Sequence, residues 1–257
     1  MSKGLAVVTG ASSGIGFELA RCCAGDGYDL VICADEPEIE AAAAKLRNGV
    51  AVSPVNADLA TEHGVGKLMQ AVGPREIDIL IANAGIGARG AFLNQPWEDS
   101  RRVVMTNVLG TLALLHRAGG RMRARGKGRV LVTGSIAGHM PGSFNAVYNG
   151  SKAYLDNFAF ALADELHDSD VTVTCLMPGP TDTEFFERAG IEDTKLATGS
   201  KSDPGHVART GYVAMMRGDR EVVPGLMNKI QSKLAGVVPE SWIARVHRTM
   251  ARPGSGE

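Results

Sequence analysis

The sequence has few cysteines, few aromatic residues and no long hydrophobic run. Its 4 cysteines among 257 residues are Cys22, Cys23, Cys33 and Cys175, which form neither a Cys-x-x-Cys pair nor a disulfide framework. No stretch approaches the ~18 uninterrupted apolar residues of a transmembrane helix. We therefore expect free thiols, a reducing compartment and a cytoplasmic protein without membrane contact.

A strong net charge is also missing. The formal charge is −1 at pH 7, which gives no long-range field to attract nucleic acid. The 6 histidines are scattered along the chain, and none lies beside a cysteine or at the spacing of metal ligands. The sequence thus predicts neither nucleic acid as a partner nor a metal site.

What is present is an alternation of short apolar strands and amphipathic helices. We predict strands at residues 5–9, 29–34, 50–55, 77–82, 129–133, 171–177 and 220–223. We predict helices at residues 14–24, 39–46, 62–72, 96–123, 146–167 and 205–216, with Pro96 in the first turn of its helix. This alternation predicts a single α/β domain over residues 1–257, with a doubly wound parallel sheet of about seven strands between two helix layers.

A glycine-rich segment follows the first predicted strand. Thr9 is followed by Gly10, Gly14 and Gly16 in a Gly-x-x-x-Gly-x-Gly spacing that opens the first helix. Glycines permit a tight turn and a close backbone approach, and a helix N-terminus attracts phosphate. By itself such a motif could equally be an ordinary turn, but its place after an N-terminal strand indicates a dinucleotide site.

Acidic and amide side chains end the next strands. Asp35 lies about 20 residues after the glycines, where a carboxylate binds an adenosine ribose hydroxyl, although it could also be an N-terminal helix acid. Asp58 could bind the adenine amine or be a turn residue. Asn83-Ala84-Gly85 ends the fourth strand, at the sheet edge where ligands bind.

Tyr148 and Lys152 stand four residues apart in a predicted helix and therefore share one face. A nearby cation favours phenolate, so we expect Lys152 to lower the pKa of Tyr148 and to make its hydroxyl a usable acid and base. Ser135 lies upstream, outside any Gly-x-Ser-x-Gly elbow, which disfavours a hydrolase.

In combination, these motifs resemble those of the short-chain dehydrogenase/reductase family, of its compact single-domain type. The resemblance covers residues 5–223 and implies a Rossmann-type fold, with a tetrad of Asn107, Ser135, Tyr148 and Lys152. It implies that Tyr148 exchanges the proton with the substrate oxygen, Ser135 orients that oxygen, and Lys152 holds the nicotinamide ribose. Asn107 would support a water chain from Lys152 to solvent.

The resemblance also implies a set of cofactor contacts. They are Gly10, Ser12, Ser13, Gly14, Ile15, Gly16, Asp35, Asp58, Leu59, Asn83, Ala84, Gly85, Tyr148, Lys152, Pro178, Gly179, Thr181 and Thr183. Ser13 and Asp35 stand where members that prefer NADP often carry a base, so we expect NAD to be preferred. An NADPH-preferring ketone reductase and a non-catalytic dinucleotide sensor remain alternatives, and an epimerase or dehydratase is disfavoured by the chain length and glycine spacing.

The expected substrate is a mid-sized, partly apolar secondary alcohol or ketone. A flap at residues 184–202 and a helical extension at residues 224–250 would border its pocket. The apolar candidates are Met140, Phe144, Phe185, Phe186, Ile191, Leu196, Leu226 and Met227. The two long helices carry apolar residues on more than one face, so we expect a homodimer or homotetramer.

Overall fold

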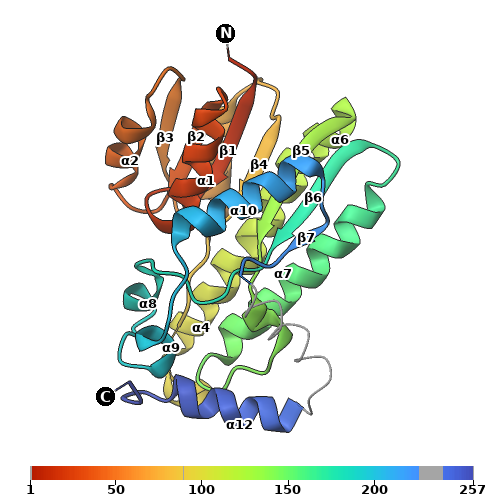
Figure 1. Cartoon of the computed structure of the whole chain (residues 1–257). Coiled ribbons are helices and arrows are strands. Elements are labelled where there is room, and N and C mark those ends of the chain that lie inside the picture. The colour runs from red at the N-terminus through yellow and green to blue at the C-terminus, as the bar shows by residue number, and fades with distance from the viewer. Residues whose placement is uncertain (1, 89, 226–239, 257) are drawn as a thin grey trace.

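The computed structural model describes residues 2–88, 90–225 and 240–256. Within them, 7 parallel strands form one sheet in the order β3-β2-β1-β4-β5-β6-β7 (Figure 1). The strands are β1 (Leu5–Thr9), β2 (Asp29–Ala34), β3 (Val52–Asn56), β4 (Ile79–Ala82), β5 (Lys127–Thr133), β6 (Asp170–Leu176) and β7 (Glu221–Val222). The order reverses between β1 and β4, which is the place where such sheets bind ligands.

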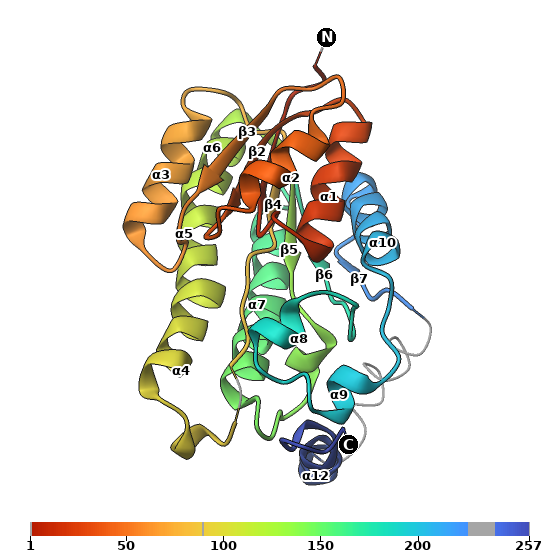
Figure 2. The same cartoon turned by 90° about the vertical axis from the view of Figure 1, so that its left-hand side faces the viewer.

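Helices cover both faces of this sheet, as Figure 2 shows. One face carries α1 (Gly14–Gly25), α2 (Ile39–Leu46) and α10 (Pro204–Arg217), and the other carries α3 (Glu62–Val72), a long helical rod and α7 (Ala146–Glu165). Side chains alternate between the faces, so Val7 packs in one core and Val8 in the other. The predicted doubly wound fold with three layers is confirmed.

The long rod is less uniform than its apolar spacing predicts. It consists of α4 (Trp97–Val104), the π-helix η2 (Met105–Gly110), α5 (Thr111–Leu114), the π-helix η3 (Leu115–Gly119) and α6 (Gly120–Arg125). Pro96 has an extended backbone and precedes the first turn, so its predicted place inside the helix is wrong. Single π turns in helices are frequent at functional sites, and η2 carries Asn107.

Two predicted strands begin later than their apolar pattern suggests, at Val52 and Ile79 instead of residues 50 and 77. Asp78, just before β4, uses its carboxylate to accept a hydrogen bond from the Leu5 amide at 2.9 Å. The side chain of Asp78 therefore binds the first residue of β1.

Further helical elements lie around the carboxyl end of the sheet, where Figure 1 places α8, α9 and α12. They are η1 (Phe92–Asn94), η4 (Ile136–His139), α8 (Phe185–Arg188), α9 (Lys195–Thr198) and α12 (Glu240–Ala251). The pocket residues predicted at 226 and 227, most of the predicted extension and the side chain of Leu196 lie outside the described residues. No helix in the described part of the chain is long and apolar enough to span a bilayer.

Candidate active site

One cavity of about 720 Å³ opens at the carboxyl ends of the central strands. Every predicted cofactor and catalytic residue except Asn107 lines it, so segments from residue 10 to residue 183 meet around one space. Met140, Phe185, Phe186 and Ile191 of the predicted pocket also line this cavity, whereas Phe144 does not.

The glycine-rich turn has the backbone that its sequence predicts. Gly10 and Gly14 adopt φ values of 63° and 57°, a region that favours glycine. A methyl group at Gly16 would lie 2.0 Å from the Gly10 carbonyl oxygen, so only glycine fits. Ser13 precedes α1 and makes no side-chain capping hydrogen bond, and the first turn of α1 holds no acidic residue. The backbone amides of that first turn therefore remain available to an anion.

Asn83 joins the ends of three strands beside this turn. Its side-chain amide donates to the carbonyls of Thr9 and Gly10 at 3.1 and 3.2 Å. Its side-chain oxygen accepts a hydrogen bond from the Thr133 hydroxyl at 3.1 Å. The ends of β1, β4 and β5 are thereby fixed relative to one another at the base of the cavity.

Asp35 and Asp58 share a cation that sequence reasoning missed. Arg102 of α4 forms ion pairs with Asp35 at 3.0 Å and with Asp58 at 3.3 Å, and all three side chains are partly exposed. Asp58 also accepts a hydrogen bond from the Ala60 amide at 2.9 Å, as a turn residue does. Arg102 thus neutralises part of the negative charge that Asp35 and Asp58 bring to this end of the cavity.

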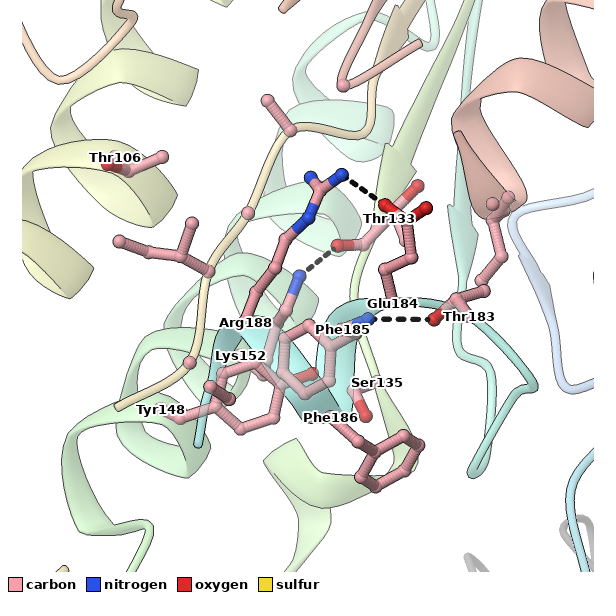
Figure 3. Close-up of a pocket in the computed structure, with 18 of the residues that line it drawn as sticks. Thr106, Thr133, Ser135, Tyr148, Lys152, Thr183, Glu184, Phe185, Phe186 and Arg188 are labelled. Carbon is pink, nitrogen blue, oxygen red and sulfur yellow. Dashed lines mark hydrogen bonds and ion pairs between the residues drawn. The ribbon is translucent and has the colours of Figure 1, made fainter. Parts of the chain in front are cut away.

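Tyr148, Ser135 and Lys152 meet at the opposite end (Figure 3). The Lys152 ammonium donates to the Thr133 carbonyl at 2.7 Å and lies 5.8 Å from the centroid of the Tyr148 ring. The Ser135 hydroxyl donates to the Pro178 carbonyl at 3.3 Å and accepts from the Ala137 amide at 3.1 Å. A cluster of hydroxyl and amine groups suited to proton transfer therefore lies at this end of the cavity.

The predicted lowering of the Tyr148 pKa by Lys152 is wrong for the chain's own groups. Burial raises the pKa of Tyr148 to about 12, while a hydrogen bond with Ser135 acts in the opposite direction. Burial also lowers the pKa of Lys152 to about 8. The physical reason is desolvation, which disfavours the phenolate, while the Lys152 ammonium donates its hydrogen bond to the Thr133 carbonyl and faces the ring of Tyr148.

Asn107 lies behind the cavity wall and is fully buried. Its oxygen accepts from the Ile86 amide at 2.8 Å, and its amide donates to the Ile86 carbonyl at 2.9 Å and to the Ser151 hydroxyl at 3.0 Å. It thus ties the segment after β4 to the helix that carries Tyr148 and Lys152.

The segment around α8 closes one side of the cavity. Figure 3 shows the ring of Phe185 beside that of Tyr148, and their centroids are 5.2 Å apart. Arg188 forms ion pairs with Glu184 and with Glu36, which follows β2, and it also donates to the Ser13 hydroxyl at 3.3 Å. Sequence reasoning missed this contact between the flap segment and the glycine-rich turn.

Thr181 and Thr183 follow β6 at the predicted place. Thr181 is buried and donates to the Gly179 carbonyl at 2.9 Å. Thr183 packs against the glycine-rich turn, because a methyl group at Gly14 would lie 2.9 Å from its Cγ2 atom.

His247 of α12 is a further polar group that sequence reasoning missed. It lines the cavity and is 5% exposed, and burial lowers its pKa. Its Nδ1 atom lies 3.0 Å from the Ser143 carbonyl oxygen. A carbonyl only accepts hydrogen bonds, so Nδ1 carries the proton of the neutral ring and Nε2 is left as an acceptor.

These features fit a dinucleotide. The positive-φ glycines, the uncapped start of α1 and Asp35 suit the adenosine and pyrophosphate half, and the polar cluster at Tyr148 lies where a nicotinamide ring would end.

Comparison with known proteins identifies the family. The family model "short chain dehydrogenase" matches residues 4–194. The chain is 30% identical over 243 residues to an uncharacterized oxidoreductase of Myxococcus xanthus, with 93% of this chain and 94% of that protein covered. It is 35% identical over 187 residues to serine 3-dehydrogenase of Rhizobium radiobacter, with 71% of this chain and 74% of that protein covered.

The fold comparison agrees. A short-chain dehydrogenase from Sphingobium yanoikuyae in complex with NADPH superposes with a TM-score of 0.81 at 28% identity, and 93% of this chain and 97% of that chain are covered. The predicted family is thereby confirmed. The chain belongs to the short-chain dehydrogenase/reductase family, the oxidoreductases that act on CH–OH groups with a nicotinamide cofactor.

Proposed function

We propose that this enzyme interconverts a mid-sized, partly apolar secondary alcohol and its ketone, with Tyr148 as general acid and base and with NAD as the preferred cofactor. The observation that carries the proposal is the meeting of Ser135, Tyr148 and Lys152 at one end of a cavity whose other end is the glycine-rich turn. The cofactor supplies hydride chemistry, and the protein supplies binding, orientation and proton transfer.

Each residue of the tetrad then has a defined role in the proposed reaction. The Tyr148 hydroxyl gives a proton to the substrate oxygen in reduction and takes it back in oxidation. The Ser135 hydroxyl holds that oxygen in place, while Lys152 binds the cofactor ribose and supplies positive charge beside the phenol. Asn107 holds the segment after β4 against α7, through its hydrogen bonds to Ile86 and Ser151.

The test is a panel of secondary alcohols and ketones, followed by NADH absorbance with the purified chain alone. Turnover would support the dehydrogenase and exclude a non-catalytic dinucleotide sensor. Binding of NADH without turnover of any member, at concentrations up to their solubility, would favour the sensor and overturn the proposal.

The preference for NAD rests on the carboxylates of Asp35 and Glu36, which would repel a 2′-phosphate. An NADPH-preferring reductase is the second candidate, because Arg102 and Arg188 pair with these acids and bring cations to the same place. Comparing kcat/KM for NADH and NADPH in the wild type decides between them. Replacing Arg102 by Ala should lower kcat/KM for NADPH more than for NADH, since it removes a cation from beside the phosphate site.

We further propose that residues 184–202 act as the substrate flap and that the single domain extends into the C-terminal region. Phe185, Phe186 and Ile191 offer the substrate an apolar wall, and Nε2 of His247 offers a hydrogen-bond acceptor. A substrate with an apolar body and a hydroxyl or amine remote from the reacting carbon would suit both the apolar wall and the Nε2 acceptor.

A cytoplasmic location is proposed because all 4 cysteines are free.

A further inference from the structure

A buried carboxylate lies directly behind the proposed catalytic residues. Asp156 stands on α7 one turn after Lys152 and two turns after Tyr148, on the same face of the helix. The residue is only 2% exposed. It does not line the cavity, so any effect on the reaction must pass through its neighbours.

The loop that carries Ser135 wraps closely around this carboxylate. Oδ1 accepts hydrogen bonds from the Ser135 amide at 3.3 Å and from the Cys175 thiol at 3.4 Å. A methyl group at Gly134 would lie 1.7 Å from Oδ1, and one at Gly138 would lie 2.2 Å from Oδ2. Side chains at both positions would collide with the carboxylate, so the two glycines permit its enclosure by the loop.

The second carboxylate oxygen has little compensation. Oδ2 is buried, and no donor among the described residues makes a hydrogen bond to it. The Nε2 atom of His139 lies 3.9 Å from it, beyond hydrogen-bond distance. A buried charge with an unpaired oxygen costs stability. Its place beside Tyr148 and Lys152 therefore points to an electrostatic task in addition to the packing of the loop.

The titratable groups around Asp156 come from three elements. Lys152 and Tyr148 lie on its own helix, Cys175 on β6 and His139 on η4. Burial raises the pKa of Asp156 to about 6, and the Lys152 charge acts against this rise. The carboxylate is thus charged at neutral pH, and its negative charge raises the pKa of both Lys152 and Tyr148.

We propose that Asp156 is a positioning residue for the proposed reaction: it fixes the loop that carries Ser135, and its negative charge acts on Tyr148 and Lys152 from behind the site. The inference rests on the proposed function, because it needs these two residues to take part in turnover. Asp156 itself touches neither substrate nor cofactor.

Replacement of Asp156 by Asn separates charge from packing. The amide has almost the same shape and keeps an oxygen for the Ser135 amide, but it lacks the negative charge that favours protonated Lys152 and Tyr148. The descending limb that Lys152 should give to the pH profile of kcat/KM for NAD should therefore move to lower pH, by about 1 unit. The Kd for NADH should stay within about twofold of the wild-type value, because the contacts of Asp156 are with the Ser135 loop.

The matched control is Asp164→Asn, on the same helix with a side chain that is 77% exposed, and its profile should equal that of the wild type. A descending limb that stays in place in Asp156→Asn, whatever happens to kcat, would overturn the inference while leaving the proposed function intact. A wild type without turnover overturns both. If Asp156→Asn does not fold, Asp156→Ser removes the same charge with a smaller side chain and must meet the same expectation.

Discussion

At the scale of single residues, the site contains polar groups that line the cavity and polar groups that lie behind its wall. Tyr148 and Lys152 line the cavity, whereas Asn107 and Asp156 are buried and do not line it. Burial displaces both members of the Tyr148 and Lys152 pair from their ordinary pKa values, upward for the phenol and downward for the amine. Desolvation disfavours the charged form of each group, which accounts for the two opposite directions.

Replacing Tyr148 by Phe should show whether the phenol exchanges the proton. The change keeps the ring that packs against Phe185 and removes only the hydroxyl. We expect kcat to fall by roughly 10²–10⁴-fold, the usual effect of losing a positioned acid or base, with the Kd for NADH unchanged. Tyr154→Phe on the exposed side of α7 is the control and should be fully active. Near-normal turnover in Tyr148→Phe would remove Tyr148 from the mechanism.

The pH dependence should report Lys152. Because burial lowers its pKa to about 8, the amine is charged below that pH and loses its proton above it. If its charge helps to bind the cofactor, kcat/KM for NAD should be level below pH about 8 and fall by about tenfold per pH unit above it. Lys152→Met should give a lower and flat profile over this range. A Met variant that retains the same descending limb would assign the limb to another group.

At the scale of elements, the tight turn between β1 and α1 leaves no room for a side chain at Gly16. In Gly16→Ala the new methyl group would lie 2.0 Å from a backbone oxygen that cannot move without opening the turn. We expect the free energy of unfolding to fall by roughly 1–3 kcal/mol. NADH binding should weaken at the same time, because the distorted turn includes Gly10 and Gly14, whose positive φ values shape the predicted pyrophosphate site.

Gly25→Ala at the other end of α1 is the matched control. Nothing lies within 4 Å of the added methyl group, so the variant should be neutral or more stable by up to about 1 kcal/mol, as helix propensity predicts. Thermal and urea unfolding followed by circular dichroism, with NADH titrations, would check both variants. Equal stability of the two would show that the turn tolerates the extra group.

The elements also show what the sequence alone could predict. Strand and helix alternation predicted the sheet because the strands are apolar on both sides, as Val7 and Val8 are in the two cores. The π-helix η2 could not be predicted, because residues 105–110 have the same apolar spacing as an α-helix. Asp156 was missed although its place four residues after Lys152 was visible in the sequence.

The cavity motifs were predictable because each combines a local backbone requirement with a chemical group. Arg102 and Arg188 were missed for the opposite reason. Their partners Asp35 and Glu36 lie 67 and 152 residues away in the chain, so only the packing of α4 and α8 brings each pair together. Contacts between exposed charged residues leave no local pattern to read.

At the scale of the whole molecule, α4, η2 and α7 leave an apolar surface uncovered. Leu109 and Tyr154 are 48% and 45% exposed, Val104 is 40% exposed, and Phe158 stacks on Tyr154 with ring centroids 6.1 Å apart. Part of the apolar excess predicted for the second long helix does pack inward, since Leu155 belongs to the core of the subunit. The remainder, which includes Tyr154, faces solvent on α7.

A second copy of the chain would cover this surface with two-fold symmetry, because the same helices would meet their own copies. We therefore expect the protein to have the mass of a dimer or tetramer in light scattering at micromolar concentration. Tyr154→Glu would place a charge in that contact and should shift the mass toward the monomer. Activity should fall with it, since α7 also carries Tyr148 and Lys152. Trp242→Glu is the control, because Trp242 is 66% exposed on a different helix, α12, and its replacement should leave the mass unchanged. A fully active wild-type monomer would contradict the prediction, since the apolar surface of α4, η2 and α7 would then face water without cost to function.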